Sequence, residues 1–143
     1  MPVALLIAAL LAGPGPIAVI VNRDCPIDHL STEDLRKLYL GLTTNLGPQG
    51  RVALAEYAPE RARFYHATLD MSEDRFRRRW IARVFAGEPG APPEEFRNTE
   101  DLIRFITTHP GAIGFIPAED TTGQVKVIAI DGHRPGDAGY RLR

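Results

Sequence analysis

A run of five apolar residues, Ile17-Ala18-Val19-Ile20-Val21, most constrains how this chain can fold. Four of the five are β-branched, which favours a strand, and no polar residue alternates with them. A strand without alternation is covered on both faces, as in an α/β sheet with helices on either side. The run therefore predicts a central strand of an α/β domain.

Capping residues mark three helix starts, at Ser31, at Ser72, and at Asn98 or Thr99. Each is followed by apolar residues at helical spacing. Pro59 suits the opening turn of a further helix, because proline is tolerated where the backbone N–H needs no partner. We therefore expect four helices.

The helix after Ser72 carries an apolar stripe formed by Phe76, Trp80, Ile81, Val84 and Phe85, and we expect Trp80 to be a core residue rather than a stacking platform. Residues 61–83 also hold seven arginines against three acids. The row Arg75, Arg79 and Arg83 has helical spacing, and a solvated helix face explains it better than a nucleic-acid patch.

Three further strands are predicted, at Val52 to Ala55, Ala112 to Ile116 and Gln124 to Ile130. Strands that alternate with helices indicate a three-layer α/β domain with helices on both faces of the sheet. At 143 residues the chain has room for one such domain, which we place at residues 17–143.

Residues 1–16 are predicted to be a signal peptide or N-terminal anchor with a linker. The apolar run Val3 to Ala12 is too short for a membrane span of about 20 residues, and Gly13-Pro14-Gly15-Pro16 follows it. No Lys or Arg precedes the run and no Ala-x-Ala site follows it, so a first buried element of the domain is the alternative. We expect an exported, periplasmic protein, tethered to the membrane if this segment is retained, with no stable transmembrane domain.

Composition removes several classes of function. The net charge of −1 provides no field for nucleic acid, and the lone Cys25 excludes an internal disulfide and the usual zinc sites. The two serines lack a Gly-x-Ser-x-Gly setting. We therefore expect a non-enzymatic protein without cofactor or metal, and the alternative is an enzyme that uses Cys25 and His29 with Asp24 or Asp28.

Arg61 is the main candidate for ligand binding. It falls in the first turn of a helix that follows a strand, where free N–H groups and the helix dipole favour an anion. The alternative is an arginine paired with Glu60 or another acid. Thr43 and Thr44, which follow Gly41, are a second polar candidate, with ordinary turn residues as the alternative.

Several segments together resemble a known family: Ile17 to Asn22, Leu30 to Leu35, Leu40-Gly41-Leu42-Thr43-Thr44, and Pro110-Gly111-Ala112-Ile113-Gly114-Phe115. Their order resembles the second lobe of the phosphate ABC transporter substrate-binding proteins, which have a type 2 periplasmic binding protein-like fold. The resemblance implies a single-lobe relative over residues 17–143, with a mixed sheet flanked by helices.

One departure from the family bears on the ligand. Members that bind phosphate present Arg-Ser-Asp-Gly-Ser-Gly-Thr-Thr after the second strand, whereas this chain has Glu56-Tyr57-Ala58-Pro59-Glu60-Arg61-Ala62. No phosphate ligand can be carried over, and Glu56 and Glu60 repel anions. We expect a solute-binding-like protein that takes at most a small oxyanion weakly, and the alternative is an envelope interaction or accessory module whose exposed lobe face docks a protein partner.

Overall fold

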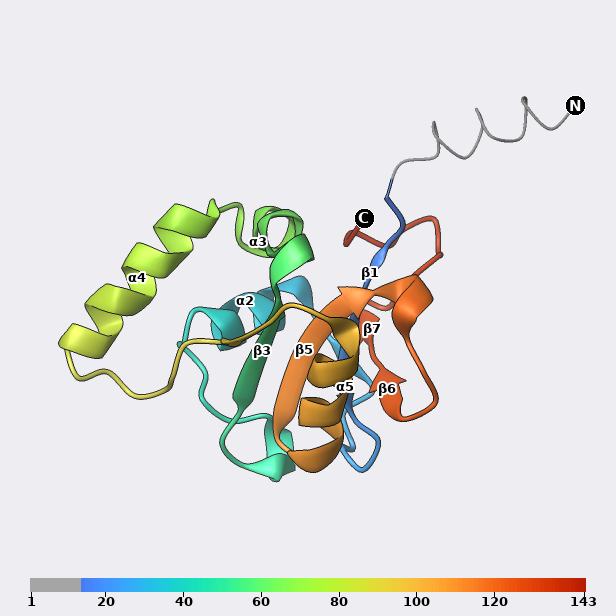
Figure 1. The fold of residues 1–143 in the computed structure, drawn as a ribbon, viewed down its shortest axis with the longest axis horizontal. Coiled ribbons are helices and arrows are strands. Elements are labelled where there is room, and N and C mark those ends of the chain that lie inside the picture. The colour runs from blue at the N-terminus through green and yellow to red at the C-terminus, as the bar shows by residue number, and fades with distance from the viewer. Residues whose placement is uncertain (1–13) are drawn as a thin grey trace, which may run out of the picture.

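The computed structural model describes residues 14–143, which form an α/β fold on one main sheet (Figure 1). The sheet has five strands in the order β4-β3-β5-β1-β6. Their bounds are β1 Ile17–Asn22, β3 Ala53–Tyr57, β4 Glu94–Phe96, β5 Ala112–Pro117 and β6 Val125–Val127. Strand β3 is parallel to β4 and β5, whereas β1 is antiparallel to β5 and β6. The predicted mixed sheet and α/β class are confirmed.

Strand β1 is an interior strand, as its apolar sequence predicts. It pairs with β5 on one side and β6 on the other, and β5 takes the middle place of the five. Its side chains alternate between two cores, with Ile17, Val19 and Val21 in one and Ala18 and Ile20 in the other. Both faces of the strand are thus covered.

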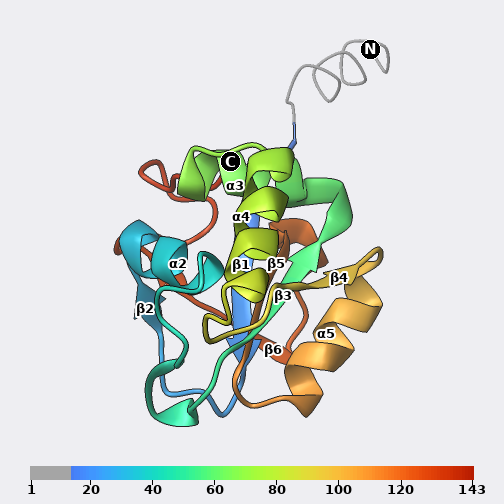
Figure 2. The ribbon, with the colours of Figure 1, turned by 90° about the vertical axis from the view of Figure 1, so that its left-hand side faces the viewer.

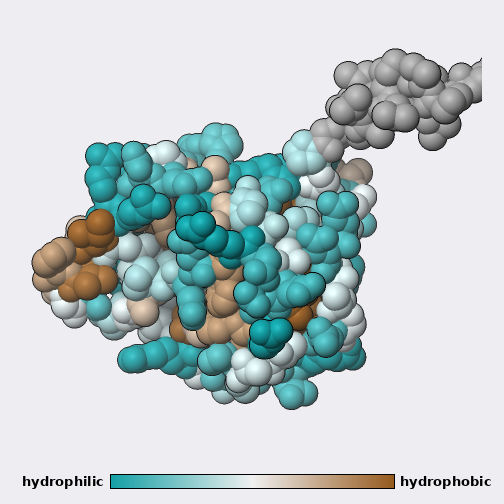
Figure 3. All heavy atoms as spheres, viewed as in Figure 1, coloured by the Kyte–Doolittle hydropathy of each residue, from teal (hydrophilic) through white to brown (hydrophobic). Residues whose placement is uncertain are grey.

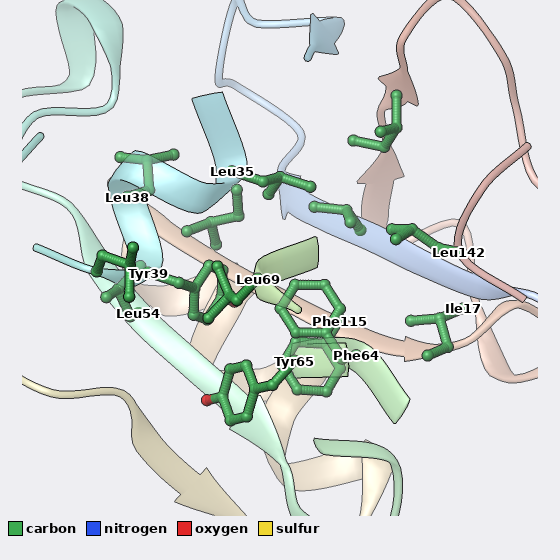
Figure 4. Close-up of a cluster of buried hydrophobic side chains, with 14 of the residues drawn as sticks. Ile17, Leu35, Leu38, Tyr39, Leu54, Phe64, Tyr65, Leu69, Phe115 and Leu142 are labelled. Atoms are coloured by element: carbon green, nitrogen blue, oxygen red, sulfur yellow. The ribbon is translucent and has the colours of Figure 1, made fainter. Parts of the chain in front are cut away.

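Helices cover the two faces of the sheet in three layers (Figure 2). Helices α2 (Thr32–Tyr39) and α3 (Arg61–Leu69) pack on one face, and α5 (Thr99–Thr108) packs on the other. In the larger core, Phe64 of α3 stacks on Phe115 of β5 with ring centroids 3.8 Å apart (Figure 4). This core fixes where α3 begins and therefore where Arg61 lies.

The predicted helix caps are present. The Ser31 hydroxyl accepts a hydrogen bond from the backbone of α2, and Ser72 does the same for α4 (Glu73–Phe85). Asn98, rather than Thr99, caps α5. Pro59 lies in a short 3₁₀ turn (η2, Ala58–Glu60) that precedes α3, so the α-helix itself begins at Arg61.

The prediction of four strands was wrong in number, because three further strands, β2, β4 and β7, are too short to carry a pattern. Strand β4 was not expected, and β2 (His29–Leu30) pairs with β7 (Ala129–Ile130) as a separate small sheet. The strand expected at Gln124 to Ile130 is divided into β6 and β7. The chain leaves β1 after the hydrogen bond from Ile128 N to Val19 O, and Ala129 N donates to Asp28 O instead.

Helix α4 extends away from the body of the molecule as an arm (Figure 1). Phe76 and Trp80 are buried, whereas Ile81, Val84 and Phe85 are exposed. The prediction that Trp80 is a core residue is therefore confirmed, whereas the last three residues of the stripe stay outside the core. Phe85 follows Phe76 by about two and a half helical turns and so lies on the opposite side of α4, whereas the body of the protein covers the side that carries Phe76 and Trp80.

The start of β1 and the C-terminal segment lie side by side. Ile17 N donates a hydrogen bond of 2.8 Å to Leu142 O, and the Tyr140 hydroxyl donates to Ile17 O at 2.5 Å. The side chains of Tyr140 and Leu142 are buried in the larger core. Burial raises the pKa of the Tyr140 phenol above its ordinary value, so the hydroxyl stays a donor.

The predicted leader, residues 1–16, falls almost wholly outside the described residues, and so does the alternative of a first buried element there. Within residues 14–143, no helix has the length and apolar character needed to cross a membrane.

Candidate functional site

Arg61 begins α3 at the carboxyl end of β3, as the sequence predicts. Its guanidinium is in contact with three carboxylates, from Glu73 at 3.1 Å, Glu56 at 3.3 Å and Glu95 at 3.6 Å. Only 19% of the Arg61 side chain is exposed. The pairing considered as the alternative is therefore present, although Glu60 pairs with Arg63 instead.

The carboxylates dominate the electrostatics around Arg61. Burial lowers the pKa of Arg61, but the hydrogen bond to Glu73 and the charges of Glu56, Glu73 and Glu95 outweigh it, so the pKa is raised overall. Burial, then Glu56, raises the pKa of Tyr65 well above its ordinary value, and its hydroxyl donates to Glu56. An anion that approached Arg61 would meet these acids first. Arg61 as an anion ligand stays a prediction.

Thr43 and Thr44 lie apart from Arg61, in the loop after α2. Both line a hollow of about 10 Å³ against Trp80 and Gly90, which has room for a single water. Thr43 N donates to Lys37 O and Thr44 O accepts from Val52 N, so backbone hydrogen bonds of both residues hold the loop in place. The structure does not bring the threonines together with Arg61, and their role as ligands also stays a prediction.

A groove of about 310 Å³ runs along α4 and is here called the α4 groove. Its inner end is polar and its outer end is apolar. The inner end holds the polar residues Glu56, Arg61, Glu73 and Arg77 with the rings of Tyr65, Phe76 and Trp80, and the outer end is lined by Ile81, Val84, Phe85, Pro92 and Pro93. The two prolines precede β4 and line the groove together with residues of α4.

The outer end of the α4 groove exposes large apolar side chains to solvent. Ile81 is 49% exposed, Val84 is 57% exposed and Phe85 is 88% exposed. Figure 3 shows apolar atoms gathered at the end of the arm. In residues 14–143, Leu42 is the other large apolar residue with such exposure. Clustered apolar exposure on a charged helix is typical of a surface that binds another molecule.

The inner half of α4 is fixed to the body by specific contacts. Trp80 Nε1 donates to Tyr39 O at 2.9 Å, and Phe76 stacks on Tyr65 at 3.9 Å. Arg83 lies over the Trp80 ring and donates to Gly41 O at 2.8 Å. Gly41 has a φ of +74°, and a Cβ there would lie 2.8 Å from both Trp80 and Arg83. The arm is therefore held in place while its outer half stays open.

The residues of the alternative enzyme differ in burial and in their partners. Cys25 is buried, at 1% exposure, whereas His29 lies exposed on β2. Asp28 pairs with Lys126 at 2.8 Å. Among residues 14–143 there is also no group of three or more His, Cys, Asp or Glu side chains that could hold a metal ion.

Neither the scan of protein-family models nor the search of curated proteins finds a match. Solved structures do match. An ABC-type phosphate transport receptor from Vibrio cholerae has a TM-score of 0.65 at 21% identity, over 90% of this chain and 53% of that one. PstS from Borrelia burgdorferi has a TM-score of 0.65 at 12% identity, over 85% and 49%.

A third solved structure is a phosphate ABC transporter substrate-binding protein from Clostridium perfringens, described as putative and with bound phosphate. It has a TM-score of 0.58 at 16% identity, and the match covers 85% of this chain and 47% of that one. This chain spans about half the length of each of these proteins. At these identities the likeness concerns the fold, and in fold this chain resembles one lobe of the phosphate ABC transporter substrate-binding proteins.

Proposed function

We propose that this chain is a non-enzymatic, exported binding module whose α4 groove docks an apolar segment of a partner protein. The observation that carries the proposal is the exposure of Ile81, Val84 and Phe85 around the outer end of the groove. Export is supported by the resemblance of the fold to periplasmic binding proteins. The solute-binding-like fold then supplies a rigid body that presents the arm.

The chemistry of the groove favours an apolar ligand over an anion. At its inner end the Arg61 guanidinium is already in contact with three carboxylates, so its charge is compensated. At its outer end, apolar side chains from α4 and the prolines Pro92 and Pro93 face the hollow. Full burial of one large apolar side chain contributes about 1.5–3 kcal/mol, so two or three such contacts support a specific complex.

The shape of the surface favours a protein segment over a lipid surface. A basic helix with apolar residues can lie on a membrane if its apolar face is convex and open. Here apolar residues of α4 line a groove together with Pro92 and Pro93. A bilayer cannot enter such a hollow as readily as a side chain can.

The test is site-specific photo-crosslinking in cells. A benzophenone amino acid at position 85 should give an adduct with one protein. The same group at position 104, an exposed position of α5, should give none. The partner identified from the adduct is then purified and titrated. The double change Val84→Ser and Phe85→Ser should weaken its binding by at least about tenfold, since it removes two apolar contacts.

Arg104→Ser is the matched control and should bind the partner normally. An adduct between two copies of the chain would identify the partner as a second copy. Equal binding of the partner by the double variant, or identical adducts at positions 85 and 104, would contradict the proposal. So would binding to phosphatidylglycerol vesicles that depends on Phe85 in the absence of any protein adduct.

A second candidate function is weak binding of a small oxyanion at Arg61. Two observations favour it: Arg61 is the first residue of α3, and one structural neighbour is described with bound phosphate. A thermal-shift series with phosphate, sulfate and molybdate tests it, because a ligand at 100 times its Kd stabilises a protein by about 2.7 kcal/mol. A shift that Arg61→Ala abolishes would support this function, and a flat series would remove it.

A further inference from the structure

Three cations line a hollow at the opposite end of the sheet from Arg61. The hollow, of about 280 Å³, is lined by Arg23, Lys126 and Arg134 around Val125 and Val127. Arg23 follows the carboxyl end of β1, and β1 runs antiparallel to β5, which is parallel to β3. The carboxyl ends of β1 and β3 therefore lie at opposite edges, and this hollow is separate from the α4 groove.

Each cation is held by a backbone oxygen from a different segment. Arg23 donates to Gly123 O, Lys126 donates to Cys25 O, and Arg134 donates to Val127 O at 3.4 Å. Within residues 14–143 each of the two arginine side chains makes this one hydrogen bond, which leaves four of its five N–H donors for a ligand.

The charge of the hollow is strongly positive for a chain with a net charge of −1. None of its lining residues is acidic. Asp28, which is 76% exposed, pairs with Lys126 and therefore offsets one of the three positive charges. The charges of Arg23 and Arg134 remain. The hydrogen bond and charge of Lys126 lower the pKa of Asp28, and the charge of Arg134 adds a smaller effect in the same direction.

We infer that Arg23, Lys126 and Arg134 form a binding site for a phosphate group. A guanidinium matches a phosphate with two parallel N–H donors, and a lysine adds a point charge. The site is distinct from Arg61, whose donors face carboxylates, and it does not depend on the α4 groove. A free phosphate ion and the headgroup of an anionic lipid share this chemistry.

The test is a titration of the full chain with inorganic phosphate at low salt, monitored by ¹⁵N–¹H NMR. The amides of residues 23–25, 125–127 and 133–134 should shift together along one binding curve. The double change Arg23→Gln and Arg134→Gln should raise the Kd by about tenfold or more, because it removes both paired donors. Arg79→Gln, at an exposed arginine of α4, should leave the Kd unchanged.

A vesicle arm separates the two sources of phosphate. If the protein sediments with phosphatidylglycerol vesicles but not with phosphatidylcholine vesicles, and the double variant does not sediment with either, the ligand is a lipid headgroup. Shifts with inorganic phosphate alone would identify the free ion. Three results would overturn the inference: NMR shifts confined to α3 and α4, a loss of phosphate affinity in Arg79→Gln as large as in the double variant, or no response to phosphate or to vesicles. Phe85→Ser should not change any of these readings, so the result is independent of the proposed partner.

Discussion

The environment of Arg61 joins elements that are distant in the sequence. Its three carboxylates come from β3 (Glu56), the first turn of α4 (Glu73) and β4 (Glu95). Without a cation between them, three carboxylates at this spacing would repel one another. Arg61 therefore stabilises the junction at which the arm leaves the body.

Replacing Arg61 should accordingly cost stability. We expect Arg61→Met to lower the free energy of unfolding by about 1–3 kcal/mol, because it leaves partly buried carboxylates without their partner. Urea denaturation measures the change. Arg79→Met should stay within about 0.5 kcal/mol of the parent, as is usual for exposed positions. A similar loss in both variants would show that Arg61 has no special structural role.

Asp131 gives a prediction about pH. Its carboxylate accepts hydrogen bonds from Thr32 N at 2.8 Å and from the Thr32 hydroxyl, and these bonds lower its pKa, the hydroxyl more than the backbone. A lowered pKa in the folded state means that the ionised form stabilises the fold above about pH 4, and that this contribution disappears as the pH falls through the folded pKa.

Asp131→Asn should therefore destabilise the protein at pH 7, by about 1 kcal/mol, and by progressively less toward pH 2. Asparagine tolerates the positive φ of 53° at this position, so the substitution tests the charge rather than the backbone. Urea denaturation of both proteins across this pH range gives the difference. A difference that stays constant with pH would exclude the carboxylate as its source.

Among the elements, α4 separates residues that hold the fold from residues that are free to bind. Trp80 is 4% exposed and hydrogen-bonded to the end of α2, whereas Phe85 is 88% exposed. Trp80→Ala should lower the free energy of unfolding by about 3–5 kcal/mol. Phe85→Ser should change it by less than about 0.5 kcal/mol. Thermal unfolding of the two variants gives the comparison, and comparable losses would mean that the outer turns of α4 are also part of the core.

The elements also show what can be predicted from a sequence and what cannot. The caps at Ser31, Ser72 and Asn98 follow from neighbouring residues, so local sequence identifies them. The stripe on α4 follows equally from helical spacing, but spacing does not reveal whether another element covers it. Strands of two or three residues, such as β2 and β7, are too short to show a sequence pattern, and they form only because they pair with another strand.

The candidate site shows the same division. Arg61 was placed correctly at a helix start, because a strand, a proline and a helix follow one another locally. Its partners Glu73 and Glu95 lie 12 and 34 residues away, and only the packing of α4 and β4 brings them near. The exposed apolar cluster had a signal in the sequence, since arginines flank the stripe at Arg77, Arg78, Arg79 and Arg83, but the same pattern also fits a buried face with a charged rim.

At the scale of the molecule, the structure has one core on each face of the five-stranded sheet. The residues in the two described cores run from Ile17 to Leu142. A chain that begins at Gly15, whose carbonyl accepts a hydrogen bond from Arg63, should unfold in one cooperative transition with the same midpoint as the full chain. Urea denaturation followed by tryptophan fluorescence tests this. A lower or broadened transition would make the first 14 residues part of the core.

The pairing of Ile17 with Leu142 has a consequence for how this fold can be combined with others. The backbone enters and leaves the domain through two adjacent segments, which are joined by the hydrogen bonds that Ile17 makes with Leu142 and Tyr140. The whole domain can therefore be inserted into a surface loop of a host protein. The two ends of the interrupted host loop would need to lie only as far apart as two neighbouring backbone segments. In such an insertion the arm, the groove and the cationic hollow would all stay outside the host, because none of their residues lies at the junction.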